Sequence, residues 1–281
     1  MGEQQRGGLD VRWHAGWPSA KHDPAPEIQT HAYDESTLIF RQNMSVHFEA
    51  PFVFLFLGAD RALLLDTGAT ADPAHFPLRK VVDEAVARWL VRHPHPSYGL
   101  VIAHTHGHGD HIAADAQFAD RPGTVTVGPG LDAVTAFYGL PRWPEGTAEL
   151  DLGGRVLDVL PGPGHEPAAT VFHDRRTGLL LTGDTLYPGH LYVRDLPEYS
   201  ATVDRLLAFC ARHPVTHVLG CHIEMTTTPG EDYPRGTTYQ PDEPPLQLTP
   251  GHLRTLRDAL AEAGGRPGVH RHDDFLLHLP E

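Results

Sequence analysis

The sequence predicts an α/β protein in which two mixed sheets pack face to face with helices on their outer sides, a four-layer αββα sandwich. Apolar runs of strand length alternate with segments whose apolar residues recur at helical spacing, and both halves of the chain show this pattern. Several of the strand runs are apolar at nearly every position, which is typical of strands covered on both faces. Strands and helices in this alternation favour a layered architecture.

The elements follow one another without a long interruption in the first half of the chain. Two apolar runs joined by the turn at 58–60 predict a hairpin, and apolar positions at helical spacing from residue 78 predict a helix. We expect strands at 37–40, 51–57, 62–66, 98–103 and 124–127, and helices at 78–91, 113–118 and 131–137.

The second half repeats this style and ends in a longer loop. Residues 226–250 are dense in Pro, Gly and Thr, which predicts a loop that covers another part of the molecule. We expect strands at 155–160, 169–173, 178–182, 216–219 and 275–279, and helices at 199–212 and 249–263.

A chain of 281 residues with 40% hydrophobic residues can bury a substantial core. Residues 1–35 are rich in Pro, Gly and charge and show no periodicity, so we expect an extended N-terminal arm. Residues 36–281 are expected to form a single domain, in which residues 226–281 make a C-terminal loop-and-helix tail.

Composition narrows the range of partners. The formal net charge is −14, and Lys21 and Lys80 are the only lysines, so the surface would repel a phosphate backbone and an anionic membrane. We therefore expect a small-molecule substrate and neither nucleic acid nor membrane as a partner; the oligomeric state stays open. The first residues are polar, and Cys210 and Cys221 make no disulfide framework, which favours a cytoplasmic location with free thiols.

A dense group of metal-ligating side chains follows the strand expected at 98–103. His106 and His108 lie two residues apart, so both imidazoles can point to one ion, and Asp110 and His111 follow where the loop enters a helix. Four nitrogen and oxygen ligands within six residues favour zinc, with iron or manganese as the alternatives. His104 lies outside this spacing and is interpreted as a packed or supporting residue.

Three more candidate ligands each come shortly after an expected strand. These are His165, Asp184 and His222. Active sites commonly collect at strand ends, and a centre with two ions needs a bridging group as well as terminal ligands. Cys221, beside His222, is interpreted as a small buried residue rather than a ligand.

These motifs together resemble those of the metallo-β-lactamase superfamily. The resemblance is carried by THGHGDH at 105–111, Gly164–His165, Gly183–Asp184–Thr185, the late His222, and Leu65–Asp66–Thr67–Gly68. It implies the four-layer fold and two metal ions, expected to be zinc. By this resemblance Asp66 supports the ligands without binding metal. The first metal would be held by His106, His108 and His165, the second by Asp110, His111 and His222, with Asp184 as the bridge.

The resemblance also implies a reaction. A hydroxide that bridges the two metals would attack an ester-like carbonyl of a thioester, lactone or similar compound, with Asp110 or Asp184 moving the proton. His190 and Tyr192 follow the bridging aspartate and are expected to donate hydrogen bonds to the substrate. Asp184 resembles the glyoxalase II and lactonase branches, so β-lactam hydrolysis is disfavoured. The lysine-free tail argues against a glutathione thioester.

Two rival functions remain open on the same scaffold. One is a persulfide-dioxygenase-like oxidoreductase with a single iron held by His106, His165 and Asp184; the other is a non-catalytic binding protein. Other roles also stay open. They concern a flap at 43–49, an ion pair between Arg194 and Asp195, and pocket walls at Tyr233 and Tyr239.

Overall fold

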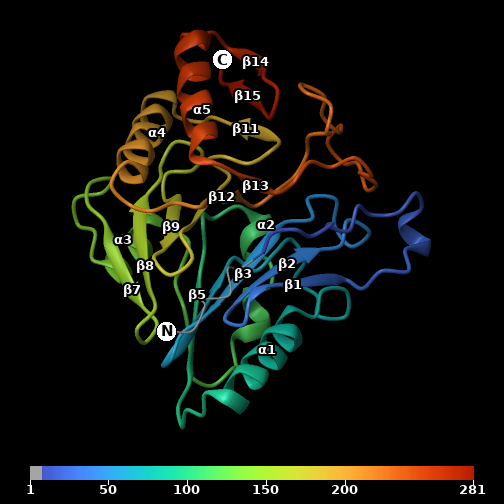
Figure 1. Ribbon diagram of the computed structural model, residues 1–281, viewed down its shortest axis with the longest axis vertical. Helices are drawn as coiled ribbons and strands as arrows, with labels where there is room; N and C mark the ends of the chain where they lie inside the picture. Colours follow the sequence, from blue (N-terminus) through green and yellow to red (C-terminus); the bar gives the residue numbers. More distant parts are fainter. Residues whose placement is uncertain (1–7) are drawn as a thin grey trace.

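A computed structural model describes residues 8–281 and shows the expected four layers (Figure 1). In this part of the chain, two six-stranded sheets form the inner layers. Helix α1 (Leu78–Arg92) packs on the outer face of the first sheet, and helices α4 (Leu196–Cys210) and α5 (Pro250–Ala263) pack on the outer face of the second. The predicted αββα architecture is confirmed.

The first sheet contains strands that are neighbours in chain order. They are β1 (Ile28–Asp34), β2 (Thr37–Gln42), β3 (Phe52–Leu57), β4 (Arg61–Leu65), β5 (Gly99–Ala103) and β6 (Thr124–Thr126). The pairs from β1 to β4 are antiparallel, whereas β4, β5 and β6 run parallel. Leu65 of β4 lies opposite Ala103 of β5, so the loops that follow these two strands leave the sheet at the same edge.

The second sheet brings together strands from the other half. Its order is β13 (Gln247–Leu248), β12 (His217–Gly220), β10 (Leu179–Gly183), β9 (Thr170–Asp174), β8 (Val156–Pro161) and β7 (Ala148–Asp151). Strands β10 and β12 are parallel, with Leu181 opposite Leu219, and their following loops also share an edge. A small third sheet, in the order β11 (His190–Tyr192), β15 (Leu276–Leu279) and β14 (Gly268–Arg271), joins the C-terminal strands to β11.

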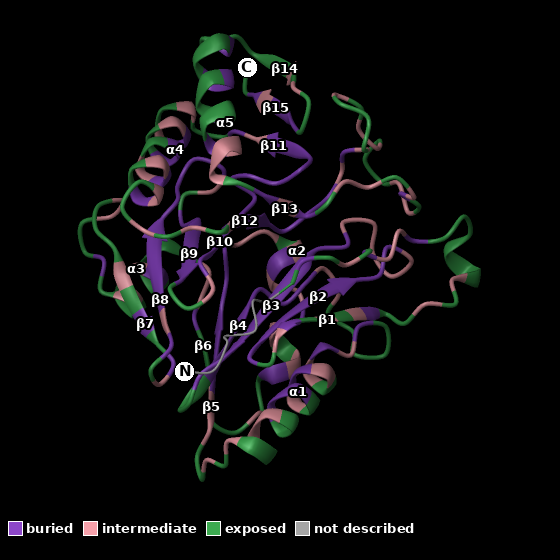
Figure 2. Ribbon diagram, in the orientation of Figure 1, coloured by how far each residue is buried: buried purple, intermediate pink, exposed green. Residues whose placement is uncertain are grey.

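Strand β3 illustrates why the sequence folds into layers. Phe52, Phe54 and Phe56 point into the core between the two sheets, and Val53 and Leu55 point into the core under α1. Side chains alternate across a strand, so an apolar run without polar interruption fits a strand that is covered on both faces. Figure 2 shows the inner strands buried throughout, while the outer faces of the helices are exposed.

The helices begin and end where capping residues occur. Asp195 caps α4 by accepting a hydrogen bond from the Glu198 amide at 3.0 Å, and Thr249 caps α5. Gly264 ends α5 in the left-handed region, at φ 57°. The remaining helical elements are η1 (Ala20–His22), α2 (Gly109–Ile112), η2 (Asp115–Phe118) and α3 (Leu131–Tyr138).

The structure differs from the sequence-based expectation at the N-terminal arm. Residues 28–34 form β1, which pairs with β2 along most of its length, so the boundary expected at residue 35 falls inside a hairpin. Polar residues on this edge strand hid the strand pattern, since only its first and sixth residues are buried. Residues 1–7 of the expected arm lie outside the described residues.

The helix expected at 113–118 is also different. The chain makes one α-helical turn at Gly109–Ile112 and then a 3₁₀ turn at Asp115–Phe118. The amide of Ala113 donates a hydrogen bond to the carbonyl of Gly68 at 3.1 Å. This bond to the loop after β4 replaces the bond that would continue the helix. Strands β7, β11, β13 and β14 were not expected; they have two to four residues each and carry no clear apolar alternation.

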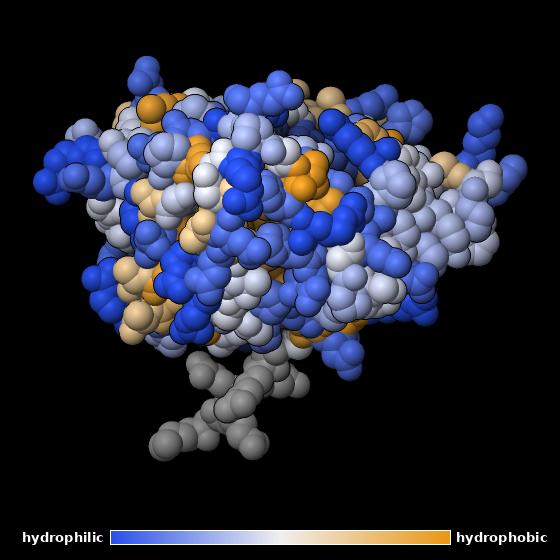
Figure 3. Space-filling view, turned by 90° about the horizontal axis from the view of Figure 1, so that it is seen from above, coloured by the Kyte–Doolittle hydropathy of each residue, from blue (hydrophilic) through white to orange (hydrophobic). Residues whose placement is uncertain are grey.

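The surface is mainly hydrophilic on the face above α5 and β14, where apolar side chains are scattered (Figure 3). This agrees with the charged composition of the chain. Within residues 8–281 no helix has both the length and the apolar character needed to cross a bilayer.

A buried ion pair between Arg155 and Asp174 ties the two sheets together. The Arg155 side chain is 4% exposed and its Nη2 lies 2.7 Å from Asp174 Oδ2. The same guanidinium donates to the Ser36 carbonyl at 2.6 Å and to Thr37 Oγ1 at 2.7 Å, both in the first sheet's β1–β2 hairpin. Arg155 therefore joins a strand end of one sheet to a turn of the other.

Replacing Arg155 by Met is expected to lower the free energy of unfolding by about 3–5 kcal/mol, because the Asp174 carboxylate stays buried without its cation. Urea denaturation followed by circular dichroism measures this change. Arg257→Met is the control, because Arg257 pairs with Asp258 on the exposed side of α5 and should cost less than about 1 kcal/mol. Equal losses in the two variants would contradict the linking role of Arg155.

Candidate metal centre

The candidate ligands lie on loops that leave the two sheets at facing edges. Residues 104–111 follow β5, His165 follows β8, Asp184 follows β10 and His222 follows β12. The parallel pairs β4–β5 and β10–β12 explain this convergence, because parallel strands end at the same edge of a sheet. The structure brings all seven predicted ligands into two adjoining groups.

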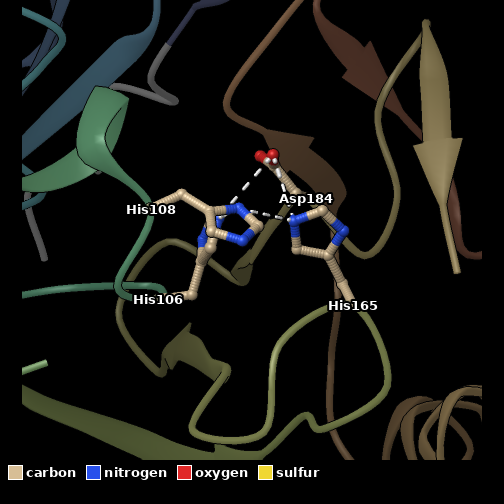
Figure 4. A group of neighbouring side chains, drawn as sticks. All are labelled: His106, His108, His165 and Asp184. Carbon is tan, nitrogen blue, oxygen red and sulfur yellow. Dashed lines mark hydrogen bonds and ion pairs between the residues drawn. The ribbon is translucent and has the colours of Figure 1, made fainter. Parts of the chain in front are cut away.

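The first group consists of three imidazoles and a carboxylate turned toward one another (Figure 4). His106 Nε2 lies 2.9 Å from His108 Nδ1, and His165 Nε2 lies 3.1 Å from the same nitrogen. Asp184 Oδ2 lies 3.8 Å from His106 Nε2 and 3.6 Å from His165 Nε2. One ligand atom from each of these four residues therefore borders a common point.

The second group is formed by Asp110, His111 and His222. Asp110 Oδ2 lies 3.4 Å from His111 Nε2 and 3.4 Å from His222 Nε2. The two imidazole Nε2 atoms are themselves 3.4 Å apart. Both histidines are buried, whereas the side chain of Asp110 is 22% exposed and borders solvent.

Asp184 connects the two groups. While its Oδ2 faces the first group, its Oδ1 lies 3.5 Å from both His111 Nε2 and His222 Nε2. Gly183 allows this approach: it has φ 52°, and a Cβ there would lie 2.7 Å from the Cβ of Thr105. The close contact between the β10 and β5 loops thus requires glycine immediately before Asp184.

Backbone carbonyls orient two of the imidazoles. His165 Nδ1 lies 2.8 Å from the Tyr192 carbonyl, and His222 Nδ1 lies 3.0 Å from the Glu49 carbonyl. A carbonyl oxygen can only accept, so each Nδ1 carries a hydrogen, and each Nε2 is the ring nitrogen that faces the centre. This is the tautomer that a metal ligand needs.

Asp66 orients the other buried imidazoles, as its predicted supporting role requires. Its Oδ2 accepts from His111 Nδ1 at 3.0 Å and from Thr105 Oγ1 at 2.9 Å, and its Oδ1 accepts from the Thr105 amide at 2.7 Å. The Thr105 hydroxyl hydrogen is used on Asp66, so Thr105 Oγ1 accepts from His106 Nδ1 at 3.2 Å. Asp66 itself makes no contact with the first group of ligands.

The donor set fits a divalent cation. His108 Nδ1 lies 2.9 Å and 3.1 Å from two other imidazole nitrogens, and such a convergence of ring nitrogens suits the coordination of a cation between them. Asp184 Oδ1 is buried and has no hydrogen-bond partner within the described part of the chain. A buried carboxylate oxygen without a partner is costly unless an ion or a proton satisfies it.

The electrostatics of the cation-free centre reflect the same arrangement. Burial would raise the pKa of Asp184, but the imidazoles of His222, His111 and His106 hold that pKa well below its usual range. Burial lowers the pKa of His106 well below its ordinary value. For His222 the carboxylates of Asp184 and Asp110 outweigh burial and raise the pKa to about 10. Positive charge is therefore favoured between these carboxylates.

Two neighbours of the ligands have the surroundings of supporting residues. The Cys221 thiol is buried, donates to Asp66 Oδ2 at 3.4 Å, and has a pKa raised by burial. A protonated thiol that donates to Asp66 is a poor metal ligand. His104 is buried between two carboxylates, with Nε2 3.2 Å from Asp115 Oδ2 and Nδ1 3.9 Å from Asp66 Oδ1.

The two residues expected at the rim differ in their surroundings. His190 Nδ1 lies 2.9 Å from His278 Nε2, and His190 Nε2 lies 3.2 Å from Asp232 Oδ2, so this imidazole is engaged with the C-terminal segment. The Tyr192 ring packs against His278 with centroids 4.5 Å apart and planes inclined by 34°, while the Tyr192 carbonyl holds His165. A direct role of either side chain toward substrate stays a prediction.

The remaining open residues take structural positions. Asp195 caps α4 by its side chain, and it forms no ion pair with Arg194 within residues 8–281. Tyr233 Oη accepts from the Asp242 amide at 2.8 Å, within the 226–250 loop. Tyr239 lines a cavity apart from the metal ligands.

Three contacts at or near the centre were not predicted from the sequence pattern. Thr105 and the Glu49 carbonyl act on ligands through hydrogen bonds, and Glu49 belongs to the segment 43–49 that was considered as a flap. Arg235 of the 226–250 loop reaches this segment, with Nη2 3.5 Å from Glu49 Oε1 and its guanidinium 5.9 Å from the Phe48 ring centre. Only the fold brings such distant residues together.

Comparison with curated proteins finds relatives that are named as hydrolases. A hydroxyacylglutathione hydrolase of Rhizobium meliloti (strain 1021) is 30% identical over 146 residues, which is 50% of this chain and 54% of that protein. One from Anaeromyxobacter dehalogenans (strain 2CP-C) is 43% identical over 86 residues, 31% of this chain and 32% of the relative. The acyl-coenzyme A thioesterase MBLAC2 of Homo sapiens is 35% identical over 78 residues, 26% of this chain and 28% of the relative. The chain thus matches about half or less of the length of these relatives.

Solved structures with the same fold are more distant in sequence. A metallo-beta-lactamase from Pontibacter korlensis has a TM-score of 0.54 at 16% identity and covers 83% of this chain and 99% of that chain. The TMB-1 structure has a TM-score of 0.55 at 14% identity, and the match covers 85% of this chain and 100% of that chain. The family model described as "Metallo-beta-lactamase superfamily" matches residues 48–267. The chain therefore belongs to the metallo-beta-lactamase superfamily.

Proposed function

We propose that this protein is a metal-dependent hydrolase that cleaves an ester-like carbonyl bond, with thioesters as the first substrate class. The observation that carries this proposal is the position of Asp184, whose two oxygens face two separate groups of imidazoles. A carboxylate between two such groups is the arrangement that a bridged pair of ions requires. The relatives named as hydroxyacylglutathione hydrolase and acyl-coenzyme A thioesterase support thioesters as the class.

Two divalent ions are proposed, and zinc is the ion that the nitrogen and oxygen donors favour, with iron or manganese as alternatives. One ion would be held by His106, His108 and His165, the other by Asp110, His111 and His222, with Asp184 shared. When bound, such ions supply a nucleophile near neutral pH and polarise a carbonyl oxygen.

The two carboxylates of the centre, Asp110 and Asp184, are proposed to have different roles. The Asp110 side chain is 22% exposed and that of Asp184 is 9% exposed, so Asp110 is the one that meets solvent. We therefore assign proton transfer to Asp110, which can accept a proton from the attacking water and pass it outward. Asp184 would serve mainly as the ligand shared between the two ions.

Tyr192 is the better of the two candidates for contact with substrate. Its side chain is partly exposed and its carbonyl already holds His165, whereas His190 is engaged with Asp232 and His278. A phenol group can donate a hydrogen bond to a developing oxyanion when the substrate brings its carbonyl within reach. We propose this role for Tyr192 and a supporting role for His190.

Removing the metal is expected to abolish hydrolysis. After dialysis against EDTA, activity should fall to background and return on addition of zinc. The reason is that the bound ions supply the proposed nucleophile, and no serine or cysteine takes that role. The measurement is a screen of thioesters, lactones, phosphodiesters and β-lactams on protein whose metals are counted by elemental analysis. Hydrolysis that persists without metal would contradict the proposal. One iron per chain together with oxygen consumption on a persulfide would instead support the oxidoreductase alternative.

A further inference from the structure

A cavity of about 460 Å³ lies between the N-terminal segment and the 226–250 loop. Except for Tyr239 and Pro241, all of its lining residues precede residue 48, where the match to the family model begins. The cavity contains none of the metal ligands. Its volume lies within the range of about 300–1,000 Å³ that is usual for small-molecule sites.

Backbone pairing builds the mouth of this cavity. Gly16 forms an antiparallel bridge with Tyr239, and the Gln240 amide donates to the Ala15 carbonyl at 2.7 Å. Gly16 has φ 75°, and a Cβ there would lie 2.0 Å from the Thr238 carbonyl oxygen, so the close approach needs glycine. The pairing gathers two aromatic side chains at one cavity, Trp17 at 44% exposure and Tyr239 at 39%.

The inner wall combines an aromatic ring with a buried cation. Trp13 is buried and lines the cavity together with Arg41, whose side chain is 1% exposed. Glu243 and the His14 carbonyl accept from the two terminal nitrogens of Arg41, but its Nε has no hydrogen-bond partner among the described residues. A buried N–H without a partner favours a ligand that brings a hydrogen-bond acceptor.

The side chains that line the cavity include basic residues but no acidic ones among the described residues. Arg12, His14 and Arg41 line the cavity, and no acidic residue does so in residues 8–281, although the chain carries a net charge of −14. Arg41 is already paired with Glu243, and His14 Nε2 lies 3.4 Å from Asp23 Oδ1, so the exposed Arg12 is the basic group of the lining that has no acidic partner among the described residues. Aromatic side chains beside such a cation suit a planar heterocycle that bears acceptors and negative charge. A purine nucleotide has this chemistry, since its base stacks on aromatic side chains and its phosphates attract arginine.

We propose that this cavity binds the purine nucleotide part of an acyl-nucleotide thioester, such as an acyl-coenzyme A, whose thioester reaches the metal centre. The segment 43–49 connects the two places: Asn43 lines the cavity, and the Glu49 carbonyl accepts from His222. Six peptide steps span at most about 20 Å, which the flexible arm between nucleotide and thioester in coenzyme A can bridge. The inference rests on the proposed thioester hydrolysis and selects one class of thioester.

Nucleotide binding tests the cavity without any catalysis. Isothermal titration of the wild-type protein with ADP should show binding, and the Trp17→Ala/Tyr239→Ala double variant should weaken it by about tenfold or more, since two stacking surfaces are lost. Trp17→Phe, which keeps a stacking ring, should retain most of the affinity. Phe137→Ala, an exposed aromatic on α3 outside the cavity, should leave affinity unchanged. Absence of ADP binding by wild-type protein would overturn the proposal.

Kinetics then tests the link to the metal centre. With acetyl-coenzyme A the double variant should show a KM raised by about tenfold, whereas with S-acetyl-N-acetylcysteamine, which has no nucleotide, its kinetics should equal those of the wild type. Equal loss on both thioesters, or no loss on either, would overturn the link. If ADP binds but no thioester is hydrolysed by metal-loaded protein, the proposed function fails while nucleotide binding by the cavity stands.

Discussion

Replacing Asp184 by Asn is expected to lower kcat/KM by about a hundredfold or more and to reduce the number of bound metal ions. In the structure Asp184 faces the first ligand group with Oδ2 and the second with Oδ1, at 3.5–3.8 Å from four imidazole nitrogens. An amide offers one oxygen, and its NH₂ group would oppose whichever ligand group it faces. Loss of a partner that only orients a ligand already costs about 10–100-fold, so loss of a shared ligand should cost more.

Two measurements test this effect. Elemental analysis gives the metal content, and steady-state kinetics gives kcat/KM on the substrate that the wild type hydrolyses. Asp132→Asn makes the same chemical change on the exposed surface of α3 and should leave both quantities unchanged. Thermal unfolding of metal-free proteins identifies a variant that merely fails to fold. Full metal content with normal kcat/KM in Asp184→Asn would show that the two groups do not share this carboxylate.

The layered fold was accessible from the sequence where the local pattern was strong. The apolar run of β3 and the helical spacing of α1 gave elements close to those observed, at Phe52–Leu57 and Leu78–Arg92. Strand β1 was not predicted, because an edge strand with one solvent-exposed face needs few apolar residues. The helix expected at 113–118 failed because a contact from a distant loop, between Ala113 and Gly68, interrupts it.

The candidate site was predictable to the extent that its chemistry is local. Four of the ligands lie within six residues, and the other three follow strand ends, so residue type and order sufficed to single out these side chains. The groups that hold these ligands by hydrogen bonds could not be predicted from residue type and order. The Glu49 and Tyr192 carbonyls carry no side-chain signature, and the contact of Glu49 with His222 joins residues far apart in the sequence.

Cavities between distant segments are the least predictable feature of this chain. The sequence pattern predicted an extended N-terminal arm, and the structure shows that its backbone pairs with the 226–250 loop through Gly16 and Tyr239. Neither segment has periodicity of its own, and their contact joins residues that are far apart in the sequence. A function that depends on their contact therefore leaves no motif, whereas metal binding leaves a dense one.

Replacing Asp66 by Asn is expected to weaken metal binding by about 10–100-fold, although Asp66 binds no metal in the proposed centre. The carboxylate is fully buried and accepts hydrogen bonds from Thr105, His111 and Cys221. Asn tolerates the left-handed backbone at this position, where φ is 67°, so the loop itself should keep its conformation. The amide cannot accept at both of its heavy atoms. If its NH₂ group faces His111, the ring must move its hydrogen from Nδ1 to Nε2, the nitrogen that points into the centre.

This substitution should therefore be distinguishable from loss of a ligand. Excess zinc should restore part of the activity of Asp66→Asn, because all ligands are still present. The substitution only disfavours the His111 tautomer that carries its hydrogen on Nδ1 and leaves Nε2 free for metal. The same zinc concentration should not restore Asp184→Asn. Titration of the metal-free proteins with zinc, followed by activity and by calorimetry, gives the two affinities, with Asp132→Asn as the common control. Wild-type zinc affinity in Asp66→Asn would mean that Asp66 serves only to hold the β4 and β5 loops together.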